Sequence, residues 1–125
     1  MDTSIFIAAE RREAPGSPPS GKARISVMTL TELLVGAHAA RGPAKAGREE
    51  TLARARSFVS IPYDEAVAEA VAKLIAAARR TNRRAALPDA IIAATALVHD
   101  LAVWTRDDDF AVLAELEPAL QLHQG

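Results

Sequence analysis

The segment Leu87–Val98 is an almost continuous run of apolar residues, and Asp89 is the charged residue within it. Proline at the second position and an acid in the first turn are typical of a helix start, because that turn has unpaired amides and attracts negative charge. A helix without a polar face is expected inside the molecule. Asp89 is therefore predicted to be a partly buried carboxylate, either a helix cap or part of a site.

Short apolar runs alternate with helical patterns along the rest of the chain. Met1–Glu10 is interpreted as a strand running into a short helix, and a loop rich in proline and glycine follows at 14–21. Apolar and β-branched runs predict strands at 24–27, 58–61, 101–105 and 120–123. Apolar residues at helical spacing predict helices at 46–56, 64–80, with Asp64 as its cap, and 111–116.

Residues 29–32, Thr-Leu-Thr-Glu, have the spacing of a capping box at the start of a further helix. The apolar residues of that helix, which are Leu30, Leu33, Leu34 and Ala37, share one face. Glu32 lies far round the helix from this face. The pattern alone therefore predicts that Glu32 is a capping residue that faces solvent.

Because a helix connects each pair of successive strands, the order of elements predicts an α/β fold with one parallel sheet of four to five strands, covered by helices on both faces. The length of 125 residues fits a single domain over 1–125. In open parallel sheets the functional cleft lies beyond the carboxyl ends of the strands. Asp2 and the run Asp107–Asp109 both stand where an apolar strand is expected to give way to a helix.

Composition excludes several classes of protein. Hydrophobic residues make up 50% of the chain and charged residues 25%, which is typical of a globular domain and unlike a disordered one. The chain has no cysteine, so disulfides and thiolate zinc sites are excluded. No apolar run approaches the roughly 18 residues of a membrane span, and no signal peptide pattern is present. We therefore expect a cytoplasmic protein without membrane contact.

The net charge of −1 does not indicate nucleic-acid binding, but the arginines are unevenly distributed. Four of them crowd into six positions just before Leu87, and these are Arg79, Arg80, Arg83 and Arg84. Guanidinium groups match the geometry of phosphates, which favours a partner that carries phosphate. The alternative is a solvated helix end whose cations interact with the negative pole of the helix dipole. The pattern leaves both interpretations open.

Acidic residues at four places along the chain are candidates for one site, and these are Asp2, Glu32, Asp89 and the run Asp107–Asp109. Carboxylates held close together raise one another's pKa unless a cation lies among them. Oxygen ligands without histidine or cysteine favour Mg²⁺ or Mn²⁺. Such an ion can activate water and offset charge on a phosphate.

Four short motifs together resemble the acidic motifs of PIN domains, specifically the VapC toxins of bacterial toxin–antitoxin pairs. The motifs are Asp2-Thr3-Ser4, Glu32-Leu33-Leu34-Val35-Gly36, the segment from Asp89 to Ala96, and Thr105 to Phe110. Each motif alone is weak, but their order and spacing fit the family over essentially the whole chain. The resemblance implies a Mg²⁺- or Mn²⁺-dependent endoribonuclease, in which activated water hydrolyses RNA and leaves a 5′-phosphate and a 3′-hydroxyl.

The resemblance also implies roles for individual residues. Asp2, Glu32, Asp89 and Asp107 would form the acidic catalytic pocket, with Asp2 and Asp89 as the principal metal ligands. Asp109 is the alternative to Asp107 as the fourth acid. Ser4 and Thr105 would brace the pocket, and the RNA backbone would be held by Arg79, Arg80, Arg83, Arg84 and Arg106. The implied partners are RNA, a VapB-type antitoxin and a second copy of the chain in a homodimer.

The chain departs from the family pattern at its start. Family members carry several apolar residues before the first aspartate, which form the central strand, whereas Met1 alone precedes Asp2 here. Either the start was assigned too late or the first strand is unusually short. We expect a version extended at the amino terminus to be more stable.

Two other classes of function compete with the nuclease. One is a catalytically inactive PIN-like binding module that uses its acids structurally or to hold a basic peptide. The other is a receiver domain, which also gathers aspartates at the strand ends of a parallel sheet. A receiver needs an aspartate at the end of its third strand, where this chain has Ser60-Ile61-Pro62, so we rank it last.

Overall fold

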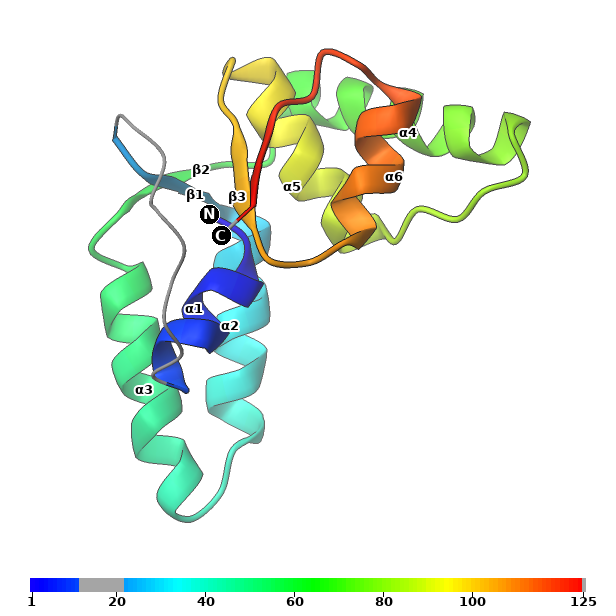
Figure 1. Ribbon diagram of the computed structural model, residues 1–125. Coiled ribbons are helices and arrows are strands. Elements are labelled where there is room, and N and C mark those ends of the chain that lie inside the picture. The colour runs from blue at the N-terminus through cyan, green and yellow to red at the C-terminus, as the bar shows by residue number, and fades with distance from the viewer. Residues whose placement is uncertain (12–21, 125) are drawn as a thin grey trace.

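The computed structural model describes residues 1–11 and 22–124, so the predicted loop at 14–21 lies outside the described residues. The described residues form six helices and four short strands. In chain order the elements are α1 (Thr3–Glu10), β1 (Arg24–Ser26), α2 (Val27–Ala39), α3 (Pro43–Ala55), β2 (Val59–Ile61), α4 (Glu65–Arg80), α5 (Leu87–Val98), β3 (Val103–Thr105), α6 (Asp109–Leu116) and β4 (Leu122–Gln124). The strands lie between α1 to α3 on one side and α4 to α6 on the other (Figure 1).

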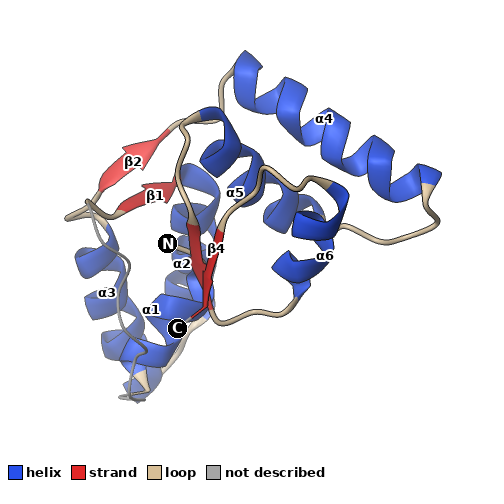
Figure 2. Cartoon of the chain, turned by 45° about the horizontal axis from the view of Figure 1, so that its top comes forward, coloured by secondary structure: helices blue, strands red, loops and turns tan. Residues whose placement is uncertain are grey.

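The four strands form two parallel pairs, β1 with β2 and β3 with β4 (Figure 2). The single sheet of four to five strands that the sequence predicts is therefore not confirmed. Met1 and Asp2 connect the two pairs. The amino group of Met1 donates to the carbonyl of Arg24 in β1 at 2.8 Å, and the amide of Asp2 donates to the carbonyl of Trp104 in β3 at 2.9 Å.

The first ten residues differ from the sequence prediction, because Thr3–Glu10 is helical and no strand precedes it among the described residues. The β-branched residues at 5 and 7 favour a strand locally. Helix formation is supported instead by Asp2, whose side chain accepts a hydrogen bond from the amide of Ser4. It is also supported by burial of Phe6, whose ring centroid lies 6.0 Å from that of Phe58 in an edge-on arrangement. Packing thus outweighs local propensity here.

The predicted capping box at 29–32 is wrong, because α2 begins three residues earlier than that box requires. Ser26 is the N-cap, and its hydroxyl accepts from the amide of Met28 at 3.0 Å. Thr29 is fully buried inside the helix, where its hydroxyl donates to the carbonyl of Met1 at 3.1 Å. Glu32 therefore lies within the helix and does not close a cap.

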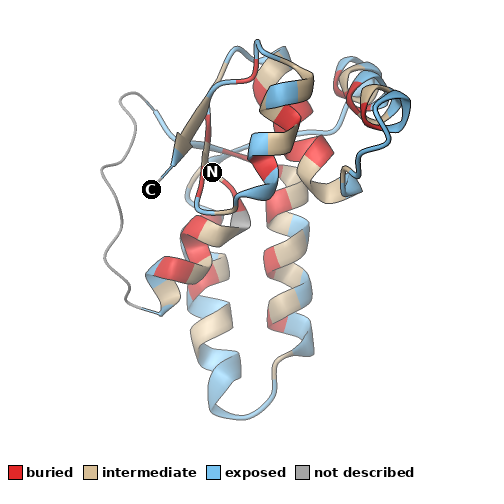
Figure 3. Ribbon diagram, turned by 45° about the vertical axis from the view of Figure 1, so that its right-hand side comes forward, coloured by how far each residue is buried: buried red, intermediate tan, exposed pale blue. Residues whose placement is uncertain are grey.

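Two hydrophobic clusters hold the molecule together, and buried positions concentrate on the inner faces of the helices (Figure 3). The larger cluster combines buried residues of α4, α5, β3 and α6. The smaller one consists of Phe6, Ile25, Leu33 and Ala55. The prediction that α5 lies inside the molecule is confirmed, because residues 90–96 are all buried. None of the helices in the described part combines the length and apolarity needed to cross a bilayer.

Candidate active site

A cleft with a volume of about 430 Å³ lies where the two halves of the molecule meet. It brings together four acids from four separate segments, and these are Asp2, Glu32, Asp89 and Asp107. Asp2 precedes α1, Glu32 belongs to α2, Asp89 to the first turn of α5, and Asp107 follows β3. The fold thus joins residues that are far apart in the sequence into one acidic surface.

Asp2 is the most enclosed of these acids, with only 3% of its surface exposed. A buried carboxylate is costly unless donors surround it. The hydroxyls of Ser4 and Thr105 each donate to its Oδ2 atom at 2.8 Å. These two bonds fix the carboxylate at the edge of the cleft, and Thr105 supplies its bond from the opposite end of the chain.

The same two hydroxyls also hold the turn after β3. The amide of Arg106 donates to the Ser4 hydroxyl at 2.8 Å, and the amide of Asp107 donates to the Thr105 hydroxyl at 2.9 Å. Ser4 and Thr105 therefore connect Asp2 to the backbone that carries Asp107. Their predicted bracing position agrees with this geometry.

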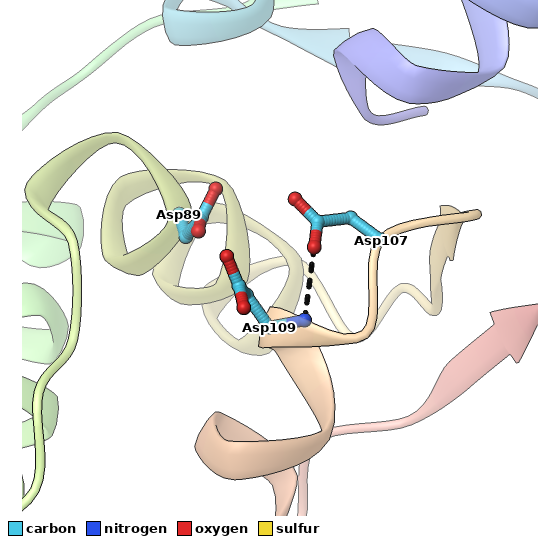
Figure 4. A group of neighbouring side chains, drawn as sticks. All are labelled: Asp89, Asp107 and Asp109. Carbon is cyan, nitrogen blue, oxygen red and sulfur yellow. Dashed lines mark hydrogen bonds between the residues drawn. The ribbon is translucent and has the colours of Figure 1, made fainter.

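Asp89, Asp107 and Asp109 form the tightest group of acids, with carboxylate oxygens that lie within 4.8 Å of one another. Figure 4 shows the three carboxylates facing one another between the first turn of α5 and the start of α6. The amide of Asp109 donates to Oδ1 of Asp107 at 2.9 Å and so orients that side chain. Both candidates for the fourth acid therefore reach the group: Asp107 lines the main cleft and Asp109 a smaller one beside it.

Asp89 is half-buried, and burial is the largest cause that raises its pKa from 3.8 to about 6. Negative charge on the surrounding acids raises the pKa further, and in decreasing order these acids are Asp107, Asp2, Asp109 and Glu32. The N-cap of α5 is Ala86, so Asp89 is not the cap residue. Of the two roles that the sequence left open, the structure favours membership of a site.

Glu32 lines the cleft, contrary to the solvent-facing position that the periodicity predicts. The prediction failed because periodicity identifies the face of a helix that packs on the core, but it cannot distinguish a face that lines a cleft from one on the open surface. A Cβ added at Gly36, one turn further along α2, would have no atom within 4 Å. The glycine therefore leaves open space beside this part of the helix.

The arginines separate into groups that the sequence could not distinguish. Arg106 lines the main cleft, together with Arg11, which no pattern in the sequence indicated. Arg84 lines the smaller cleft beside Asp109. Arg11 follows the last turn of α1, so only the correct prediction of that helix would have placed it on the same side as Ser4. Arg80 lines neither of these two clefts.

The acidic group has the donor chemistry of a site for a hard divalent cation. Mg²⁺ binds oxygen ligands at about 2.0–2.1 Å, so two ligands on opposite sides of one ion lie about 4 Å apart. The oxygens of Asp89, Asp107 and Asp109, all within 4.8 Å of one another, need to move only slightly to share one ion. Burial and, after it, the negative charge of the neighbouring acids raise the pKa of Asp89, and a cation among these acids would offset that charge.

Comparison with known proteins places the chain in a family. A family model described as the PIN domain matches residues 1–116, so the chain belongs to the PIN domain family. Ribonuclease VapC4 of Mycobacterium tuberculosis is 39% identical over 118 residues, which cover 93% of this chain and 91% of the relative. Ribonuclease VapC5 of the same organism is 36% identical over 115 residues, covering 90% and 85% of the two chains.

A solved structure gives the same result in three dimensions. The crystal structure of VapBC-5, a toxin–antitoxin system of Mycobacterium tuberculosis, matches with a TM-score of 0.79 at 34% sequence identity. The match covers 98% of this chain and 93% of that chain. Within the PIN domains, the chain is a member of the VapC family, as the four acidic motifs predicted.

Proposed function

We propose that this chain is a divalent-metal-dependent endoribonuclease and the toxin of a VapBC-type toxin–antitoxin pair. The observation that carries the proposal is the convergence of Asp2, Glu32, Asp89 and Asp107 in one cleft. The relatives named as ribonucleases support RNA as the substrate. Among the alternatives, no observation favours the inactive binding module.

The geometry suggests a division of roles among the acids. Asp2, Asp89 and Asp107 are the proposed ligands of Mg²⁺ or Mn²⁺, either directly or through water, and Glu32 and Asp109 complete the negative surface. Ser4 and Thr105 are positioning residues, because they hold Asp2 through hydrogen bonds at 2.8 Å. Groups that orient metal ligands in this way commonly affect metal affinity as well.

The proposed reaction is hydrolysis of an RNA phosphodiester. When bound, a divalent cation lowers the pKa of water and offsets negative charge on the reacting phosphate. The water oxygen bonds to phosphorus, the bond from phosphorus to the 3′ oxygen breaks, and that oxygen takes up a proton. The products are a 5′-phosphate and a 3′-hydroxyl. Arg11 and Arg106 line the cleft, where their guanidinium groups suit the phosphate oxygens of the substrate.

A protein partner is also proposed. The solved VapBC systems that resemble this chain are toxin–antitoxin complexes. We propose that a VapB-type antitoxin covers the cleft and that the toxin forms a homodimer within the complex. Val35 supports a partner surface, because 62% of this apolar residue is exposed on the same helix that carries Glu32.

The two strand pairs are proposed to function as one open parallel sheet. Met1 and Asp2 occupy the position between β1 and β3, where hydrogen bonds to both strands join the pairs. Asp2 then follows the middle of the sheet and is flanked by the ends of strands on both sides. This arrangement agrees with the expected cleft at the carboxyl ends of parallel strands.

The decisive experiment incubates the purified chain, freed of any antitoxin, with a mixture of structured RNAs and Mg²⁺ or Mn²⁺. Asp89→Asn is compared with Asp108→Asn, since Asp108 is exposed and belongs to neither acidic cleft. We expect cleavage that requires the metal, is lost in Asp89→Asn and is retained in Asp108→Asn. Equal cleavage by both variants would refute the assignment of the site. Metal binding without cleavage of any RNA would favour the binding module.

A further inference from the structure

Two further clefts lie beside the acidic cleft, and arginines line both of them. A cleft of about 180 Å³ shares Asp89 with the main one and extends past Asp109 to Arg84. A third cleft of about 370 Å³ shares Arg84 with the second and is also lined by Arg79 and Arg83. Because neighbouring clefts share lining residues, the three lie next to one another along one track, which begins at the acids and ends in a cleft lined by three arginines.

The backbone between α4 and α5 holds these arginines in a defined arrangement. Asn82 adopts a positive φ of 55°, which ends α4 in the left-handed conformation that asparagine tolerates. The amide of Arg83 then donates to the carbonyl of Ala78 at 2.8 Å, and that of Asn82 donates to the carbonyl of Arg79 at 3.2 Å. This closed helix end fixes where the backbone at Arg83 leaves α4.

The chemistry of the third cleft suits a nucleic-acid strand. The lining of this cleft, as far as the structure describes it, contains three arginines and no acid. Guanidinium forks bind phosphate oxygens through paired hydrogen bonds. Leu87, an apolar residue with 55% of its surface exposed, forms part of the wall. Apolar walls and guanidinium planes also accommodate unstacked bases of single-stranded RNA.

We propose that Arg79, Arg83 and Arg84 form a phosphate-binding subsite for single-stranded RNA at a distance from the bond that is cut. The proposal rests on the nuclease function proposed above, because the substrate would run from the acids along the track to the arginines. Arg80 is not part of the proposed subsite. Arg80 lines a different groove, together with Lys73, Leu97 and Glu117, among others.

Glu115 would compete with an RNA phosphate for Arg83. Its carboxylate on α6 forms an ion pair with Arg83, and both side chains are partly exposed to solvent. A phosphate of RNA would have to share or replace this carboxylate at the guanidinium group. Removal of the Glu115 charge should therefore strengthen RNA binding, whereas loss of the arginines should weaken it.

The test measures binding of a fluorescent single-stranded RNA by anisotropy in the Asp89→Asn background, where cleavage is not expected. We expect Arg79→Ala/Arg84→Ala to weaken binding at least about tenfold and to reduce the slope of log affinity against log salt by about 0.7 for each phosphate that is no longer bound. For a control matched in charge, the single variants Arg84→Ala and Arg80→Ala are compared: Arg84→Ala should weaken binding, whereas Arg80→Ala should change it less than about twofold. Glu115→Gln should bind more tightly than its parent. Melting temperatures check that each variant is folded.

Each outcome distinguishes this proposal from the nuclease proposal. Loss of RNA binding in the arginine variants, together with no cleavage by the wild-type chain, would support the subsite and refute the nuclease. Wild-type cleavage with unchanged binding in the arginine variants would refute the subsite alone. An equal loss of RNA binding in Arg80→Ala would mean that any positive charge in this region supports binding, and it would overturn the proposal. So would arginine-dependent binding of an acidic peptide by a chain that does not bind RNA.

Discussion

The two halves of the molecule hold their acids in different ways. In the half built from α4, α5, β3 and α6, Asp89, Asp107 and Asp109 lie on or beside elements that pack around a large hydrophobic cluster. In the other half, a cluster of four buried residues supports α1, which follows Asp2, and α2, which carries Glu32. Asp2 depends on hydrogen bonds that reach it from the larger half. Packing within its own half thus positions Asp89, whereas Asp2 is held by hydrogen bonds from the other half.

Replacement of one phenylalanine in each half should give the largest contrast. Phe110 is fully buried in the larger cluster, so Phe110→Ala is expected to cost about 3–5 kcal/mol of unfolding free energy. Phe6→Ala should cost less, because the smaller cluster can collapse around the cavity, but it should weaken divalent-metal binding by displacing α1. Denaturant unfolding and metal titration measure the two effects. The comparison fails if Phe110→Ala disturbs metal binding in the folded protein more than Phe6→Ala does.

The hydrogen bond that joins the halves can be removed with little change in shape. Thr105→Val deletes the hydroxyl that donates to Asp2 and accepts from the amide of Asp107. Loss of such a group beside a metal ligand is expected to reduce metal affinity about 10–100-fold. Isothermal titration with Mn²⁺ measures this. Thr81→Val, at the end of α4 and away from the acids, is the control and should bind the metal as the wild type does. Unchanged affinity in Thr105→Val would show that Asp2 is held by packing after all.

The space between β1 and β3 offers a way to stabilise the protein. A narrow crevice of about 30 Å³ runs from Met1 between β1 and β3. Four apolar residues added before Met1 could pair with both strands, and we expect a gain of about 1–2 kcal/mol after the ordering cost. A Gly-Ser extension of the same length should give no gain. Equal melting temperatures for the two extended forms would contradict strand pairing in the crevice.

The raised pKa of Asp89 predicts a pH dependence of stability. The folded protein holds this proton up to about pH 6, whereas the ordinary pKa is 3.8. The contribution of Asp89 to stability is therefore complete below about pH 4 and is lost as the pH rises through 6. Because the group is half-exposed, the loss should not exceed about 1 kcal/mol. The difference in melting temperature between wild type and Asp89→Asn, followed from pH 4 to 8, measures it. Saturating Mg²⁺ should reduce the difference, and a difference that does not vary with pH would refute the assignment.

The smallest expected effect concerns Gly36 in the half with the smaller cluster. A Cβ at this position meets no atom within 4 Å, so Gly36→Ala should stabilise α2 by about 0.5–1 kcal/mol through helix propensity alone. Thermal unfolding measures the gain. A loss of RNA cleavage in this more stable variant would show that substrate approaches the helix at Gly36. Destabilisation would mean that the space beside the helix is filled.

Local sequence patterns correctly predicted the helices whose formation and burial depend on their own residues. The periodicity of α4 and its cap at Asp64 agree with the structure, in which the Asp64 carboxylate accepts from the amide of Val67 at 3.0 Å. The apolar composition of α5 correctly indicated burial. The start of α2 could not be predicted in this way, because Ser26 ends a strand that pairs with β2 and also caps the helix. Residues 29–32, with a glutamate three positions after a threonine, gave a cap signal that favoured a later start.

The site shows the same limit. Residue chemistry made its acids candidates and the family motifs supported the grouping, whereas the pattern around Glu32 alone pointed to solvent. Arg84 lines the cleft beside Asp109, whereas Arg80 lines another groove. This difference depends on how α4 ends and α5 begins. Arg11 gave no signal, because it is adjacent to the other cleft residues only when residues 3–10 form a helix. These neighbour relations are tertiary, and no local pattern contains them.

The hydrogen bond between Asp2 and Thr105 spans 103 residues of a chain of 125. During synthesis the first acid emerges early, but the partner that fixes it emerges among the last residues. An incomplete chain therefore cannot assemble the acidic cleft, whatever else of it has folded. At rates of 5–20 residues per second, this separation delays completion of the site by roughly 5–20 s. Under the proposed nuclease function, the order of synthesis itself delays activity, since the nascent chain has no complete acidic cleft until it is nearly finished.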